Sequence, residues 1–157
     1  MKHTIQAIVE NKFGVLARVA SLFSARGYNI ESLAVGETQD PSVSCMTLVV
    51  DAPDERILEQ IKKQLHKLVN VVTVVDFTRK EYLDRDLLLT KIAKKDGEEE
   101  ALRELEQKYH VRILEQKEKY YLLEITTERH HEEDLLRTLK KIGILELVRT
   151  GRIAIGK

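Results

Sequence analysis

The sequence predicts an α+β protein built from two ferredoxin-like βαββαβ units in tandem. Two observations lead to this fold class. Each half of the chain shows the same order of strand-like and helix-like apolar patterns, and the density of charge changes between the halves. Residues 1–77 contain 8 basic and 9 acidic side chains, whereas residues 78–157 contain 18 and 17. We therefore predict one domain over residues 1–77 and a second over residues 78–157.

The first half opens with a strand over residues 4–10, where apolar side chains recur at every second position. A turn over residues 11–14 leads into a helix that starts at Val15. This helix should end at Gly27, because glycine readily takes the left-handed conformation that follows a helix. The stripe expected to face the core, with helical spacing, consists of Leu16, Val19, Ala20 and Phe23.

Two strands follow over residues 29–37 and 43–51, joined by a turn that contains Pro41. A second helix should start after Pro53, and a final strand covers residues 69–77. The apolar face of the second helix is formed by Ile57, Leu58, Ile61 and Leu65. The first half thus reads βαββαβ.

The second half repeats this order with a higher charge density. Its predicted elements are a strand over 86–94, a helix over 98–109, strands over 110–116 and 119–126, a helix over 131–142 and a strand over 145–149. The first of these helices should turn Leu102, Leu105 and Tyr109 inward. The second begins with acidic residues and ends with Lys140, Lys141 and Gly143, as the helix dipole and the left-handed stop favour.

The strand over residues 69–77 carries branched apolar side chains at positions that point to both faces of a sheet. These are Val69, Val71, Val72, Val74 and Val75. A unit of this size has little core of its own, and its two helices cover only one face of the sheet. Pairing with a second copy would cover the apolar side chains on the open face of the sheet, so we predict a homodimer.

Composition narrows the classes of function. The 26 basic and 26 acidic residues cancel, so the chain has no overall positive field for nucleic acid or an anionic membrane. No apolar run approaches the roughly 20 residues that span a bilayer, and the start lacks the apolar core of a signal peptide. The single cysteine, Cys45, can form no disulfide within the chain. We expect a cytoplasmic protein that binds neither nucleic acid nor membrane.

The motifs of common enzymes are missing from the sequence. It has no nucleophile elbow, phosphate-binding glycine loop or zinc-type spacing of Cys and His. His130 and His131 are adjacent and would point apart on a helix, and carboxylate runs such as residues 98–100 are typical of solvated helix starts. An RNA-binding sheet would need stacking aromatic residues, and the strand over 43–51 has none. We predict no catalytic residues and no metal site.

One constellation could bind a small ligand. A free amino acid needs N–H donors for its carboxylate, which the helix start at Val15 provides, and oxygen acceptors for its ammonium. Asn11 and Asn29 offer both donor and acceptor, and Gly14 lets a ligand approach the backbone. A simpler interpretation stays open at this point: Asn11 shapes the turn, Gly14 permits it, and Asn29 only starts a strand.

Several stretches resemble one protein family. The segments NKFGVLARV at residues 11–19 and LFSARGYNIESL at 22–33 are similar to the ACT domain of acetohydroxyacid synthase (acetolactate synthase) small subunits. The resemblance continues through SCMTLVV, LEQIKKQLHKLVNVV and RDLLLTKIA, and returns in RTGRIAIGK at the end. The charged part over residues 94–137 carries no motif of the family.

The resemblance implies a regulatory subunit without chemistry of its own. Such a subunit activates the catalytic large subunit of acetohydroxyacid synthase and gives it feedback inhibition by valine or another branched-chain amino acid. It also implies that the effector binds between two paired ACT domains, and that thiamine diphosphate, Mg²⁺ and FAD belong to the catalytic partner, with no cofactor in this chain. The effector-binding residues that it implies are Asn11, Gly14, Val15, Leu16, Asn29 and Ile30.

Two alternatives remain at this stage. The chain could be a stand-alone ACT-type amino-acid sensor that acts on a different partner. It could also be an enzyme of acylphosphatase type on the same fold, but that chemistry would need an arginine in the loop after the first strand, and residues 11–14 contain none.

Overall fold

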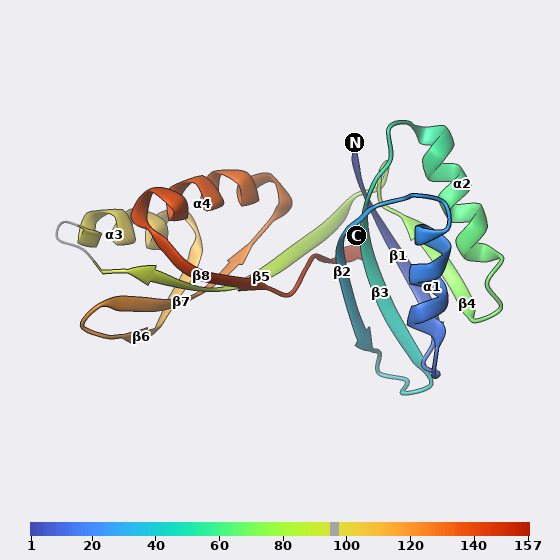
Figure 1. Cartoon of the computed structure of the whole chain (residues 1–157), viewed down its shortest axis with the longest axis horizontal. Coiled ribbons are helices and arrows are strands. Elements are labelled where there is room, and N and C mark those ends of the chain that lie inside the picture. Colours follow the sequence, from blue (N-terminus) through green and yellow to red (C-terminus); the bar gives the residue numbers. More distant parts are fainter. Residues whose placement is uncertain (95–97) are drawn as a thin grey trace. The chain divides into compact units, whose positions relative to one another are not determined.

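The computed structural model describes residues 1–94 and 98–157. Two compact units are present. The first contains Met1–Leu83 together with Arg152–Lys157, and the second contains Asp84–Gly151. Each unit has the order βαββαβ (Figure 1), which confirms the α+β fold class. The return of the last six residues to the first unit was not predicted from the sequence.

The first unit is a four-stranded antiparallel sheet in the order β2-β3-β1-β4. Both helices lie on the same face of this sheet (Figure 1). Its elements are β1 (Lys2–Glu10), α1 (Val15–Ser24), β2 (Ile30–Glu37), β3 (Val43–Asp51), α2 (Glu55–His66) and β4 (Val71–Asp76).

The core of the first unit lies between the sheet and the two helices. Alternate residues of β1 point into it, and Ile5 and Ala7 pair with Leu48 and Met46 of β3 in the same layer. From α2 the core receives Leu58, Ile61 and Leu65, as the periodicity predicted, while Ile57 packs at its edge. Burial of this face provides most of the stability of a short helix, since propensity alone is marginal.

The buried stripe of α1 differs from the predicted one. The side chains that it buries are Val15, Val19, Leu22 and Phe23, whereas Leu16 is 45% exposed and Ala20 is exposed. The predicted and the observed buried faces of α1 both contain Val19 and Phe23. The observed face adds Val15 and Leu22, which bury more apolar area than the Leu16 and Ala20 of the predicted face. The tertiary contact with the sheet selects the phase of the helix.

The last residues of the chain cover part of the other face of the first sheet. Strand β9 (Ile153–Gly156) pairs with β5, and the Gln6 amide Nε2 donates a hydrogen bond of 2.9 Å to the carbonyl oxygen of Ala154. The backbone N–H of Arg152 donates to the Ser32 hydroxyl at 2.9 Å. Thr4 and Val49 form a register pair on this face, and both are almost fully buried.

Some of the apolar side chains of residues 69–77 stay uncovered. Val69 is 94% exposed and Val72 is 60% exposed.

The second unit is a sheet in the order β6-β7-β5-β8, with β9 joined to β5. Its elements are β5 (Tyr82–Ala93), α3 (Glu98–Lys108), β6 (His110–Gln116), β7 (Tyr120–Thr127), α4 (Arg129–Ile142) and β8 (Ile144–Arg149). Leu102, Leu105 and Tyr109 are buried, as predicted. Gly143 ends α4 with a φ of 118°. The side chains of Glu98 and Glu99 lie outside the described residues.

Candidate functional site

The turn between β1 and α1 presents a helix start that no side chain caps. Gly14 occupies the N-cap position with φ 81° and ψ −5°, and the first turn of α1 contains no acidic residue. The N–H groups of a first helical turn have no partner within the helix. In α1 no N-cap side chain bonds to them. The positive end of the helix dipole therefore meets any anion that binds at this turn.

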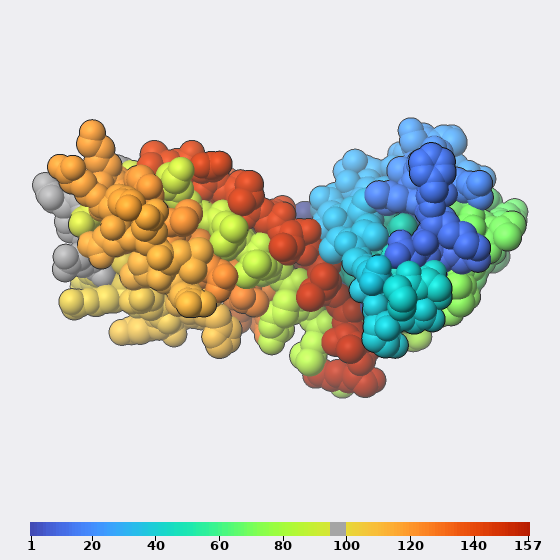
Figure 2. All heavy atoms as spheres, turned by 90° about the horizontal axis from the view of Figure 1, so that it is seen from below, coloured from blue at the N-terminus to red at the C-terminus, as the bar shows by residue number. Residues whose placement is uncertain are grey.

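Asn11 is held in one orientation by the connection between β2 and β3. Its amide Nδ2 donates to the carbonyl oxygen of Pro41 at 2.9 Å and to the Glu37 carboxylate at 3.2 Å. Its backbone N–H donates to the carbonyl oxygen of Ser42 at 2.7 Å. Figure 2 shows the blue turn before α1 beside the cyan atoms of this connection. Both amide hydrogens are thus in use, so Oδ1 is the atom that can accept a hydrogen bond from a ligand.

Glu37 and Pro41 are parts of this arrangement that the sequence reasoning missed. They lie 26 and 30 residues after Asn11, and they reach it only because β1 and β2 both pair with β3. No local pattern in the sequence signals such a contact.

Asn29 and Ile30 lie at the opposite end of α1 from Asn11 and Gly14. A helix of ten residues is about 15 Å long, which exceeds the reach of a small amino acid. A single copy of the chain therefore does not bring the two asparagines to one ligand. The resemblance implied that the effector binds between two paired ACT domains, and a site in which the second copy supplies Asn29 is compatible with this separation.

The apolar residues of the predicted site lie at different depths. Val15 is 4% exposed and belongs to the core, and Ile30 is half-buried against the same core. Leu16 is at the surface. Phe13, which the sequence reasoning did not include, is fully exposed in the turn, and Val35 on β2 is 45% exposed. Leu16, Phe13 and Val35 are thus the apolar side chains of this region that a second chain could cover.

A hydrogen-bonded chain of side chains connects the end of β1 and α1 with the residue that precedes β4. Asn70 donates to the Glu10 carboxylate and accepts a hydrogen bond of 2.7 Å from the Arg18 guanidinium. Lys12 pairs with Glu10 at 3.0 Å. The hydrogen bonds from Asn70 and Lys12 lower the pKa of Glu10 below its ordinary value. This carboxylate therefore stays ionised beside the turn.

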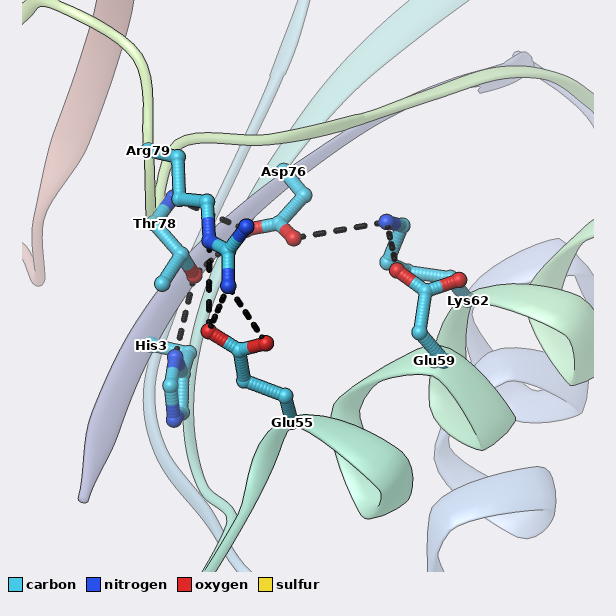
Figure 3. A network of polar contacts seen from close by, with 7 residues as sticks. All are labelled: His3, Glu55, Glu59, Lys62, Asp76, Thr78 and Arg79. Carbon is cyan, nitrogen blue, oxygen red and sulfur yellow. Dashed lines mark hydrogen bonds and ion pairs between the residues drawn. The ribbon is translucent and has the colours of Figure 1, made fainter.

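A second polar network holds the chain that follows β4 against α2 (Figure 3). Thr78 donates to Asp76 through its backbone N–H at 2.8 Å and its hydroxyl at 2.6 Å, and Lys62 lies 3.4 Å from the same carboxylate. Arg79 forms a bidentate pair with Glu55. Burial raises the pKa of Asp76, but the hydrogen bonds from Thr78 and the charge of Lys62 outweigh it, so the pKa is lowered overall.

These contacts give the second network a structural interpretation. Each carboxylate in it already has a cationic or hydroxyl partner. Within residues 1–94 and 98–157, no group of three His, Cys, Asp or Glu side chains is arranged to hold a metal ion.

Comparisons with known proteins cover both units. Residues 5–73 match the model of the AHAS small subunit-like ACT domain, and residues 85–157 match the model of the small subunit of acetolactate synthase. The chain belongs to the family of acetolactate synthase small subunits. It is therefore a regulatory subunit with an N-terminal ACT domain, as the resemblance implied.

Individual relatives support this assignment over the whole length. The acetolactate synthase small subunit of Mycobacterium leprae is 41% identical, with 99% of this chain and 91% of that protein covered. The probable small subunit of Archaeoglobus fulgidus is 39% identical, with 98% and 96% covered. The crystal structure of the small subunit from Thermotoga maritima has a TM-score of 0.88 and 31% identity, and covers 100% of this chain and 98% of that one.

Proposed function

We propose that this chain binds the catalytic large subunit of acetolactate synthase, raises its activity and gives it feedback inhibition by a branched-chain amino acid, with valine as the expected effector. The family assignment supports a catalytic partner, since the relatives are named as subunits of that enzyme. The main observation for the effector site is that the start of α1 has no side-chain cap and lies beside Asn11, whose amide nitrogen is already hydrogen-bonded and whose Oδ1 can accept from a ligand.

The effector is proposed to lie between two copies of the chain. The helix start at Gly14 would bind its carboxylate, and Oδ1 of Asn11 would accept from its ammonium. The second copy would supply Asn29 and Ile30, and Leu16 would contact the aliphatic side chain. Two supports for a homodimer are the separation of Asn11 from Asn29 within one copy and the exposed apolar side chains of Phe13, Leu16 and Val35.

The cofactors of the reaction are proposed to belong to the catalytic subunit. Thiamine diphosphate, Mg²⁺ and FAD would bind there, and this chain would act in the cytoplasm by changing how its ACT domains pair. In the part of the chain that the structure describes, no helix has the length and apolar character needed to cross a membrane. A coupling of about 1–3 kcal/mol between sensor and enzyme is enough for such control.

The test is reconstitution of the synthase from separately purified subunits, with the Asn11→Ala variant and a Gln39→Ala control. Gln39 is an exposed residue of the β2–β3 connection. Asn11→Ala should abolish inhibition by valine and heat release in calorimetric titration, and it should leave activation of the catalytic subunit intact. Gln39→Ala should leave both intact. Unchanged valine inhibition in Asn11→Ala would disprove the assigned site, and failure to bind the catalytic subunit would indicate a different partner.

A further inference from the structure

The groove between α1 and α2 is lined by positively charged side chains and no negatively charged one, although the chain as a whole is neutral. It is lined by Ala17, Arg18, Ser21, Leu22, Arg26, Gln64, Lys67 and Leu68, and it has a volume of about 470 Å³. Three of these side chains are cationic and none is acidic. Residues 11–30 and 60–75, which contain all of the lining, have no Asp or Glu at all. The total charge of the chain at pH 7 is zero, so this groove is a local concentration of positive charge.

Some cations of this unit are paired with a carboxylate, and the cations of the groove are not. Lys2, Lys12, Lys62 and Arg79 each pair with a carboxylate. Arg18, Arg26 and Lys67 form no ion pair among the described residues. Their charge is therefore available to an outside partner.

Neutral side chains orient the two guanidinium groups. Arg18 donates to Asn70 Oδ1 and Arg26 donates to Gln64 Oε1, each at 2.7 Å. An amide oxygen fixes a guanidinium but does not cancel its charge, and the remaining N–H groups stay free for bidentate contact with a carboxylate. Less side-chain entropy is then lost when an anion binds.

The spacing of the cations favours an elongated ligand. Arg18 lies in the second turn of α1 and Arg26 lies two residues after its end at Ser24, so the two cations stand near opposite ends of the groove. Two carboxylates one or two turns apart on a protein segment can contact both cations. Between the cations, Ala17 and Ser21 are small, and Leu22 and Leu68 provide apolar contact. An acidic segment laid along two helices has this combination of charge and shape.

We propose that the α1–α2 groove is a docking site for an acidic segment of the catalytic subunit. The charge complementarity selects an acidic segment, and the identity of the partner rests on the proposed function. The docking site is separate from the effector site: the groove lies along the helices, whereas the effector residues lie at the ends of α1.

The test measures the affinity of the separately purified catalytic subunit for the full chain and two groove variants. Arg18→Glu/Arg26→Glu reverses both guanidinium charges. Arg26→Glu/Lys67→Glu leaves the hydrogen bonds of Arg18, Asn70 and Glu10 in place. The control, Arg56→Glu/Lys80→Glu, makes the same change in net charge at exposed cations that are not in the groove. Circular dichroism and valine calorimetry check that each variant keeps its fold and effector site.

Both groove variants should weaken binding about tenfold or more, and the loss should shrink as salt is raised, because screening removes the attraction. The control should bind within about twofold of the original chain. Equal losses in groove variants and control, or no loss in the groove variants, would overturn the docking site. So would competition in which inorganic pyrophosphate binds the groove without displacing the catalytic subunit. If the original chain does not bind the catalytic subunit, the proposed function itself is wrong.

Discussion

Gly14 holds the left-handed backbone that lets the chain turn from β1 into α1. A Cβ atom at this position would meet no other atom within 4 Å, so the space around it is open and only the backbone conformation requires glycine. Gly14 has a φ of 81°. Residues with a side chain rarely adopt this backbone angle, because their Cβ atom would come too close to the backbone carbonyl. The residue thus serves both the turn and the exposed helix start.

We expect Gly14→Ala to lower the free energy of unfolding by about 1 kcal/mol, since alanine must adopt the left-handed conformation. Gly36→Ala is the matched control, because Gly36 also has open space around it but no positive φ. Urea unfolding followed by circular dichroism measures both. If the two substitutions had equal effects, the left-handed backbone conformation at position 14 would not be strained when alanine occupies it.

Asp76 should make the stability of the chain depend on pH in the acidic range. Its pKa is lower in the folded chain than its ordinary value, so its stabilising contacts are fully present above the unfolded pKa of about 4 and are lost as the pH falls through the folded pKa. Asp76→Asn should therefore be less stable than the original chain at neutral pH, and the difference should shrink toward low pH.

The measurement for Asp76 is urea unfolding at a series of pH values. Glu104→Gln serves as the control, because Glu104 is exposed and has no ion pair among the described residues. A stability difference for Asp76→Asn that stays constant across the pH series would contradict the argument.

At the scale of elements, the two helices of the first unit begin in different ways. Asp54 caps α2 with its side chain, which accepts a hydrogen bond of 2.9 Å from the N–H of Ile57. Gly14 at the same position of α1 has no side chain to do this. Thus α2 begins with a side-chain cap, whereas α1, which is proposed to bind the effector at its start, has none.

Asp54→Ala should lower the free energy of unfolding by about 1 kcal/mol, the usual effect of removing an N-cap side chain. The control is Arg56→Ala, an exposed change in the first turn of the same helix, which should have a small effect. Chemical denaturation compares the two variants. Asp54→Ser should recover most of the loss, because serine also caps helices; no recovery would exclude capping as the cause.

At the scale of the whole molecule, the chain returns to its first unit after completing the second. Residues 152–157 form hydrogen bonds with Gln6 of β1, Ser32 of β2 and Glu81, and β9 pairs with β5. The face of the first sheet that its helices leave open is thereby closed in part by the last strand. Pairing between two copies was the cover predicted from the sequence, whereas the structure shows that residues 152–157 of the same chain provide part of it.

Removing residues 152–157 should destabilise the first unit more than the second. Hydrogen exchange followed by mass spectrometry should show faster exchange in β1, whose Gln6 loses its hydrogen bond to Ala154, and in β3, which pairs with β1 along its whole length. The amides of β7 provide an internal control, because they belong to the second unit. Equal acceleration in both units, or none in β1 and β3, would show that the tail does not stabilise the first sheet.

The sequence alone was sufficient for the type and order of twelve elements. The alternation of Ile5, Ala7 and Val9 and the helical spacing of Leu58, Ile61 and Leu65 are local signals, because each is set by the geometry of one strand or one helix. The positions of Asn11, Gly14 and Asn29 as candidate ligand residues were also visible, since residue type and the adjoining turn are properties of neighbouring positions.

Other features depended on contacts between distant parts of the chain. The phase of α1 was decided by the sheet, which buries Val15 and Leu22 in place of Leu16. The short strand β9 has too few residues to show a pattern and is held by Gln6 and β5. Glu37 and Pro41 reach Asn11 only through the register of three strands.

The chain's own sequence thus determined its fold class, the order of its elements and its family. Tertiary structure alone decided which amide atom of Asn11 is already hydrogen-bonded, which cations lack a carboxylate, and where the last strand lies. The physical reason is range: periodicity and turn chemistry act between neighbouring residues, whereas hydrogen-bond satisfaction and charge pairing depend on which distant residues the folded sheet brings together.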